Sequence, residues 1–436
     1  MRVDRIHRGL LFVGLVAALT GCRDDNQTLD ELLDRAAELP GVRSSSHSAL
    51  REEFRLVELS RGLPEHLNED PVLAHQNAAV ALEDALPQLE TITRINEQTQ
   101  AFLEAVPVAD ATFIHSESGA LGAKWVNQTA AVDEATGLPD CDFEIRLEHG
   151  YFNDLTFVYR VAAGCRLLLV DSLYHFGSND EVALARLAAA WKWTDWLAES
   201  HHVEARVQAA QLRSEALLVL EAFANRPGVT RDDLTTLHAI LQESVNPWPS
   251  VKETLVRERA LAIATYEGLR LHLCDLLFTL EERSQLRADG VYETLRQAEV
   301  EQVDADEAAY LEYMREIIAV ADQPFHERSK HLVECDRLLR ANEQTDDFPW
   351  FANHLFVLNN SLTLAQRELA SDRGRIQGWL TLLSDALGVA PPTNNTNPVN
   401  GEKYQVQSRG SQRFVDLGDR RSANPRLTVP PLLGGR

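Results

Sequence analysis

The apolar residues between positions 155 and 176 constrain the fold of this chain more than any other feature. They recur at steps of three and four, which is the spacing of one face of an α-helix. The segment is rich in Val, Phe and Tyr, but about 20 residues is far too long for a β-strand. Asp154 stands at the expected N-cap and Gly177 at the expected C-cap. The pattern therefore predicts one long helix in this part of the chain.

Similar spacing on both sides of this segment predicts further helices joined by short turns. The expected ranges are 72–86, 88–106, 181–199, 203–224, 231–243, 251–282, 305–321, 327–342 and 351–371. Alanine is frequent on one face of the segment 203–224, and small side chains let neighbouring helices approach closely. We therefore predict a mainly α fold, in which residues 49–390 form repeat-like stacked helical hairpins. The repeat length is not constant, so a tetratricopeptide array is not expected.

One region within this helical body has a different composition. Residues 110–150 contain several glycines and two stretches with β-forming residues, 124–128 and 142–147. Glycine is unfavourable inside helices, and short β-leaning stretches between glycines are typical of strands and loops. The sequence therefore predicts a loop-rich insertion that contains one or two short strands.

The composition changes again after residue 390. Residues 391–417 begin with a Pro- and Asn-rich linker, and the stretches 403–407 and 413–417 then predict a short β-hairpin. Residues 418–436 are rich in Pro and Arg, so they are expected to be a disordered basic tail. The carboxyl end is thus predicted to be separate in character from the helical body.

The amino terminus resembles a bacterial lipoprotein signal. Three arginines among the first eight residues precede an apolar run at 9–19, which is shorter than the roughly 20 residues that span a membrane. The sequence Leu-Thr-Gly-Cys that ends at Cys22 resembles the lipobox. The resemblance implies removal of residues 1–21 and attachment of acyl chains such as palmitate to Cys22. The alternative is an ordinary secretory signal followed by a chance cysteine.

Lipidation predicts where the protein resides. Two or more acyl chains hold a protein stably on a membrane without any spanning segment. We therefore expect a lipid-anchored protein of the cell envelope that faces the periplasm or the outside. Residues 22–48 then form a partly flexible tether between Cys22 and the helical body.

Charge narrows the range of partners. The net charge is −24 at pH 7, which disfavours binding of nucleic acid or anionic lipid by the protein body. The segment from Pro391 onward is an exception, because Lys403 and six arginines outnumber its three acidic residues. We expect the membrane to be contacted through Cys22, a protein to be the partner, and nucleic acid not to be bound.

Three stretches resemble secreted or lipid-anchored helical proteins of unknown function from planctomycete-type bacteria. The stretches are 142–169 with the following turn at 178–184, 306–315, and 364–404. In that family the last stretch is similar to the carboxyl end of type II secretion pseudopilins. This chain departs from the pattern with Asn397 in place of the usual aspartate and Ile376 in place of the usual proline. The resemblance implies a helical fold and a weak pseudopilin-like carboxyl segment, but no activity.

Cysteine spacing permits two disulfides in an oxidising compartment. Cys141 and Cys165 lie 24 residues apart in the sequence, and Cys274 and Cys335 lie 61 residues apart. Unpaired cysteine is also a common small core residue, and Cys165 and Cys335 lie on apolar helical faces. Both interpretations remain open from the sequence.

The sequence contains two incomplete metal motifs. His326 and His331 resemble the H-E-x-x-H zinc motif, but the extra residue turns the second histidine to another helical face. Glu199 and His202 have the spacing used in di-iron bundles, which require two such motifs. Phosphate-binding, dinucleotide-binding and nucleophile motifs are lacking. We therefore predict no metal, no cofactor and no catalytic residue.

The remaining candidate site is an aromatic and histidine-rich junction at 191–204. Trp193 and Trp196 can share a helical face near His201 and His202. Clustered aromatic side chains bind ligands, although packing in a helical core is their more common role. This junction is the candidate ligand-binding site of the sequence.

Three functional hypotheses follow. The first is a noncatalytic, lipid-anchored envelope protein that acts as a scaffold and offers a helical surface to a protein partner. The alternative is an envelope enzyme or small-ligand binder that uses the junction at 191–204. A third hypothesis treats residues 401–417 as a pseudopilin-like assembly element.

Overall fold

The computed structural model describes residues 73–428, except for 144, 146, 201, 246–247, 279, 289, 342–347, 354–361 and 418–425. The predicted signal peptide, Cys22 and the predicted tether at 22–48 lie outside the described residues. His201 and the last eight residues of the predicted tail do so as well. No described helix combines the length and the apolar character that crossing a membrane requires.

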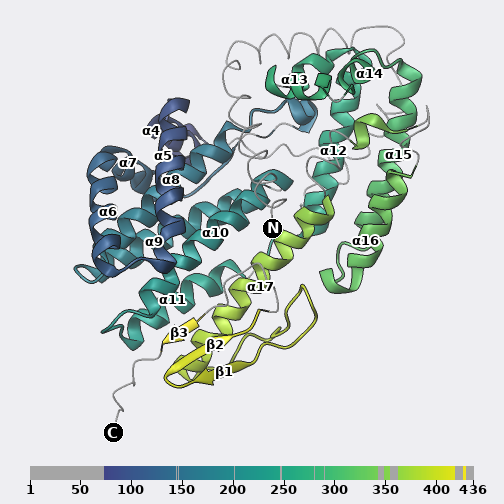
Figure 1. Cartoon of the computed structure of the whole chain (residues 1–436). Coiled ribbons are helices and arrows are strands. Elements are labelled where there is room, and N and C mark those ends of the chain that lie inside the picture. The colour runs from purple at the N-terminus through teal and green to yellow at the C-terminus, as the bar shows by residue number, and fades with distance from the viewer. Residues whose placement is uncertain are drawn as a thin grey trace.

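The structure is mainly α, as the sequence predicts, and its helices fall into two groups (Figure 1). The first group contains α4 (Ala78–Ala85), α5 (Leu89–Ala105), α6 (Ala111–Lys124), α7 (Val126–Thr136), α8 (Thr156–His175), α9 (Asp180–Glu199), α10 (Val203–Ala224) and α11 (Arg231–Ser244). The second group contains α12 (Val251–Arg270), α13 (Leu280–Ala288), α14 (Tyr292–Arg296), α15 (Val300–Ala319) and α16 (Phe325–Leu339). Short 3-10 helices are η1 (Ala74–Gln76), η2 (Val106–Val108), η3 (Leu147–Phe152) and η4 (Leu273–Leu277).

Helix α8 confirms the predicted central helix. Asp154 accepts a hydrogen bond from the backbone N–H of Thr156 at 2.8 Å, and Gly177 follows the helix with a positive φ of 79°. Short connections bring α9 and α10 back beside the preceding helix, which produces the predicted stacked hairpins. Alanines such as Ala205 and Ala209 on α10 are completely buried, so the backbones of α9 and α10 approach closely.

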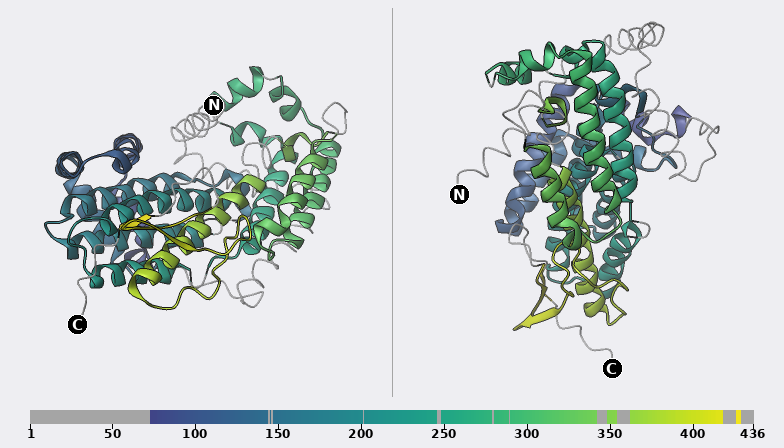
Figure 2. Two further views of the ribbon diagram at one scale, coloured as in Figure 1. Left: turned by 60° about the horizontal axis from the view of Figure 1, so that its bottom comes forward. Right: turned by 90° about the vertical axis from the view of Figure 1, so that its right-hand side faces the viewer.

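Each group has its own apolar core. The first core is formed by α4–α11, and the second core by α12–α16. Helix α17 (Leu362–Leu387) belongs to both. Its first residue, Leu362, packs in the second core, whereas its carboxyl half, with Trp379 and Leu383, packs in the first. Helix α17 therefore connects the two groups, as the views in Figure 2 show.

A small antiparallel sheet covers the carboxyl end of α17. Strand β1 (Val406–Arg409) pairs with β2 (Gln412–Val415), and β2 pairs with β3 (Arg426–Thr428). The first two strands confirm the predicted hairpin. The third corrects the expected disordered tail at 426–428, where Leu427 is completely buried in the first core. An apolar side chain in that position orders a segment whose composition indicates disorder.

The expected insertion at 110–150 is wrong over residues 111–136, which form α6 and α7. Val132 and Ala135 on α7 are buried against the first core, so tertiary packing outweighs the low helix propensity of nearby glycines. Residues 124–128 form the junction of the two helices. An isolated bridge pairs Asp140 with Asn77, and residues 141–143 are irregular.

The expected helix at 251–282 is also too long. Helix α12 ends at Arg270, and His272 adopts a left-handed conformation with φ 58°. That conformation cannot continue an α-helix and is rare outside glycine. The chain continues through η4 into α13, so the apolar residues between 271 and 278 form the connection between two helices rather than part of one longer helix.

Candidate functional site

The tryptophans of the junction at 191–204 are packed in the first core. Trp193 is completely buried, and its Nε1 donates a hydrogen bond to Thr136 Oγ1 at 2.7 Å. The half-buried Trp196 packs edge-on against Trp193 with ring centroids 5.0 Å apart, and the ammonium of Lys192 lies over its ring. These contacts hold α9 against α7 and leave no face of Trp193 open to a ligand.

His202 has a structural role at the start of α10. Its ring is buried, and Nδ1 accepts a hydrogen bond from the backbone N–H of Glu204 at 3.2 Å, which caps the helix. The ring also lies edge-on to Tyr151. The structure therefore places His202 at a helix cap and Trp193 in the core, and the two do not line a common cavity.

The four described cysteines are free thiols, so neither of the two disulfides is formed. The Cys165 thiol points toward α9, where Ala190 O lies 3.5 Å from its sulfur. Cys335 lies beside His331 on α16, with 3.6 Å between sulfur and Nε2. Burial raises the pKa of Cys141 and Cys274 to about 12, so these thiols are weakly reactive.

Among the described residues, no three His, Cys, Asp or Glu side chains are arranged to hold a metal ion. His326, from the zinc-like motif, instead contacts the carboxyl segment. Its backbone N–H donates a hydrogen bond to Pro398 O at 3.1 Å. A side chain at Gly401 would overlap the His326 ring, since an added Cβ would lie 2.8 Å from it.

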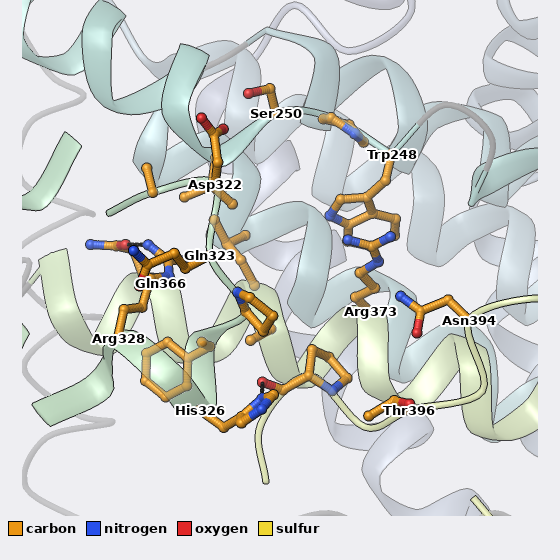
Figure 3. A pocket seen from close by; sticks show the side chains of 18 of the residues that line it. Trp248, Ser250, Asp322, Gln323, His326, Arg328, Gln366, Arg373, Asn394 and Thr396 are labelled. Atoms are coloured by element: carbon orange, nitrogen blue, oxygen red, sulfur yellow. Dashed lines mark hydrogen bonds between the residues drawn. The ribbon is translucent and has the colours of Figure 1, made fainter. Parts of the chain in front are cut away.

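A pocket of about 360 Å³ lies where the two helix groups meet (Figure 3). Its walls come from the residues before α12, the turn between α15 and α16, the start of α16, the middle of α17, and the segment 394–398. Helix α17 determines this position because its two halves belong to different cores. The pocket is thus a consequence of the way in which α17 joins the groups.

One face of α17 forms the floor of the pocket. The lining residues are Gln366, Leu369, Ala370, Arg373 and Gln377. They follow one another at steps of three, one, three and four, which keeps them on the same side of a helix. This face is unusual because polar and charged side chains alternate with apolar ones where two apolar cores adjoin.

Arg373 has no acidic partner in the part of the chain that the structure describes. Its guanidinium carbon lies 5.7 Å from the centroid of the Trp248 ring, and Figure 3 shows the two side chains stacked. Within the described part of the chain it forms no ion pair or hydrogen bond, and its Nε is buried. Burial lowers the pKa of Arg373, as expected for a positive charge without a counter-ion.

Arg328 likewise forms no ion pair with a carboxylate among the described residues. It is only 3 % exposed, and its Nη1 donates a hydrogen bond to Gln366 Oε1. This bond fixes the amide of Gln366 with Nε2 as a donor, and neither Nε2 nor Arg328 Nε has a partner among the described residues. Burial lowers the pKa of Arg328 to about 10, an effect that Asp322 partly opposes. Arg328 and Gln366 thus each carry a hydrogen-bond donor without a partner among the described residues at this end of the pocket, and Asp322 is the acidic residue near them.

The surroundings add positive potential. Buried Arg206 supports the wall by donating hydrogen bonds to Pro249 O and Ser250 O, and burial lowers its pKa to about 9. The amino ends of α12 and α16 line the pocket, and helix amino ends carry partial positive charge. Asp322 is the acidic residue of the described lining, and its carboxylate pairs with Lys252 at 3.1 Å. The pocket is therefore a positive site in an acidic protein.

Comparisons of the chain with protein families, with curated proteins and with solved structures found no match.

The arginines of this pocket were not predicted from the sequence. His326 stands there only as a possible metal ligand, and no role was predicted for Trp248. One signal was available on the segment 362–387, where Gln366, Arg373 and Gln377 occupy the same helical face as Leu369. That pattern shows polar side chains on an otherwise buried helical face. Which residues of α12 and α16 lie opposite these side chains depends on the tertiary fold.

Proposed function

We propose that the protein is a lipid-anchored component of the cell envelope that acts by binding an organic anion in the pocket between α12, α16 and α17. The observation that carries this proposal is that Arg328, which is buried, and Arg373, which is half-buried, lack a carboxylate partner among the described residues. A buried charge is costly unless an opposite charge compensates for it. Carboxylate and phosphate groups supply that charge and accept the hydrogen bonds that these arginines can donate.

The lining also supports binding rather than reaction chemistry. The Ser250 hydroxyl accepts a hydrogen bond from the backbone N–H of Glu253 and so caps α12. Aromatic and aliphatic side chains, including Trp248 and Phe325, form much of the remaining wall. Pockets of this size with a few convergent polar groups are typical of small-molecule sites.

The protein partner inferred from the sequence remains a prediction. The large apolar side chains that are exposed lie on α6, α7, α8, α15, α16 and α17 and on two connecting segments. This distribution does not define a single docking surface. The pseudopilin-like residues also serve the fold, because buried Tyr404 donates a hydrogen bond to Gly374 O of α17 at 2.8 Å.

Anion binding should raise the unfolding temperature of the full-length protein, purified in detergent. We expect citrate or inorganic phosphate, compared with chloride at equal ionic strength, to raise the midpoint by about 2 °C or more. The variant Arg373→Gln should lose this increase, because it removes a charge that the described structure leaves unpaired. Differential scanning calorimetry measures both effects.

The matched control is Arg315→Gln, which removes an exposed arginine of α15 that pairs with Glu312. This variant should retain the full response to citrate. An equal increase in wild type and Arg373→Gln would show that the anions act nonspecifically, and would contradict the proposed binding function.

The anchor is tested separately with Cys22→Ser. Loss of the lipidated thiol should move most of the protein from the membrane fraction to the soluble fraction, because acyl chains alone are proposed to hold it. Fractionation and labelling with radioactive palmitate measure this change, and Cys141→Ser serves as the control. The anchor is excluded if the Cys22→Ser protein stays in the membrane fraction and neither this variant nor the wild type takes up palmitate.

A further inference from the structure

The two unpaired arginines occupy opposite ends of the pocket. Arg328 is bonded to Gln366, and Arg373 lies seven residues further along the same face of α17. Seven residues are two helical turns, or about 10 Å along the axis. Figure 3 shows the Arg328 and Arg373 side chains on opposite sides of the cavity. The positive charge is therefore divided between two separate points.

Apolar side chains line part of the space between these points. Leu369 and Ala370 lie between Gln366 and Arg373 on α17, and Val251 and Phe325 contribute to the walls. A compact ion such as phosphate can compensate one arginine but cannot reach both ends. A ligand that satisfies both ends needs two acidic groups joined by a spacer that tolerates an apolar surface.

We propose that the pocket binds an elongated organic dianion, with an acidic group at each end and an apolar middle, as in a medium-length α,ω-dicarboxylate. This inference rests on the proposed binding function and specifies its ligand class. One carboxylate pairs with the Arg328 guanidinium at the end of the pocket that Gln366 also lines. The other pairs with Arg373 beside the Trp248 ring, and the hydrocarbon spacer covers Leu369 and Ala370.

The test uses isothermal titration calorimetry of the full-length protein in detergent with succinate, adipate, suberate and sebacate. Each diacid is compared with the monocarboxylate of equal length, such as octanoate for suberate. We expect an optimum within the series at which the diacid binds about tenfold or more tightly than its monoacid. The variant Arg373→Gln should abolish that advantage and bind suberate and octanoate alike, while Arg373→Lys should restore part of it.

Variants at the other end complete the design. Arg328→Lys keeps the charge of a buried side chain and should retain a diacid preference, and Arg315→Gln should match wild type. If diacids bind no better than monoacids of equal length and both still require Arg373, the dianion inference is overturned. The proposed function is then left intact. If diacids, monoacids, citrate and phosphate all fail to bind, the proposed function falls as well.

Discussion

Replacing Asp372 with alanine should lower the free energy of unfolding by about 3–5 kcal/mol, because it breaks a buried ion pair. Asp372 on α17 is completely buried, and its Oδ2 accepts a hydrogen bond at 3.0 Å from Nη1 of Arg213 on α10. The truncation leaves the Arg213 guanidinium buried with Asp195 as its remaining acidic partner. Burial raises the pKa of Asp372 and Arg213 opposes that rise, so the carboxylate depends on this pairing.

Urea denaturation followed by circular dichroism measures this loss. Glu312→Gln is the matched control, because it breaks an exposed ion pair with Arg315 and should change stability by less than about 1 kcal/mol. The double variant Arg213→Met with Asp372→Leu should recover much of the lost stability, since both fully buried charges are removed, and Asp195, which loses Arg213, is partly exposed and keeps its hydrogen bond from Ser244. A cost for Asp372→Ala no larger than that of the control would show that the pair does not hold α17 against α10.

The second large effect is expected at Gly150, where the variant Gly150→Ala should cost about 3 kcal/mol or more. The backbone here has φ 55° and ψ −139°, a conformation that is essentially restricted to glycine. An added Cβ would lie 2.4 Å from Thr265 Oγ1 and 2.7 Å from Leu261 O on α12. The overlap involves backbone of a buried helix, so neither side can move at low cost.

Gly177→Ala separates the cost of backbone strain from the cost of steric overlap. Gly177 also has a positive φ, 79°, but a Cβ there would meet no atom within 4 Å. Its substitution should cost only the backbone strain, about 1 kcal/mol. Chemical denaturation of both variants provides the comparison, and equal costs at the two positions would mean that close packing of Gly150 on α12 is not important for stability.

The sequence predicts helices well where one apolar face and its caps act within the same segment. Helix α10 begins and ends at the predicted residues, and α8 differs by one residue at each end. Prediction fails where distant contacts decide the local structure. Residues 111–136 are helical because the first core buries one side of them, and α12 stops at Arg270 although apolar residues continue beyond it.

The pocket shows the same limit for function. Clustered aromatic and histidine residues near 191–204 attract attention in the sequence, but Trp193 and His202 form hydrogen bonds that serve packing and capping. Arg328 and Arg373 look ordinary in the sequence, because most arginines are exposed and paired. Their significance follows from burial or half-burial without an acidic partner among the described residues, which depends on residues from three distant helices.

The late position of α17 in the sequence has a consequence for the order of assembly during synthesis. More than 100 residues separate α11 from α17, yet both pack in the first core, and Leu427 fills the same core near the end of the chain. Helices α8–α11 therefore leave the ribosome long before the elements that cover them, and they must wait with apolar surface exposed. We therefore expect a chain that stops before α17 to leave apolar surface of the first core uncovered.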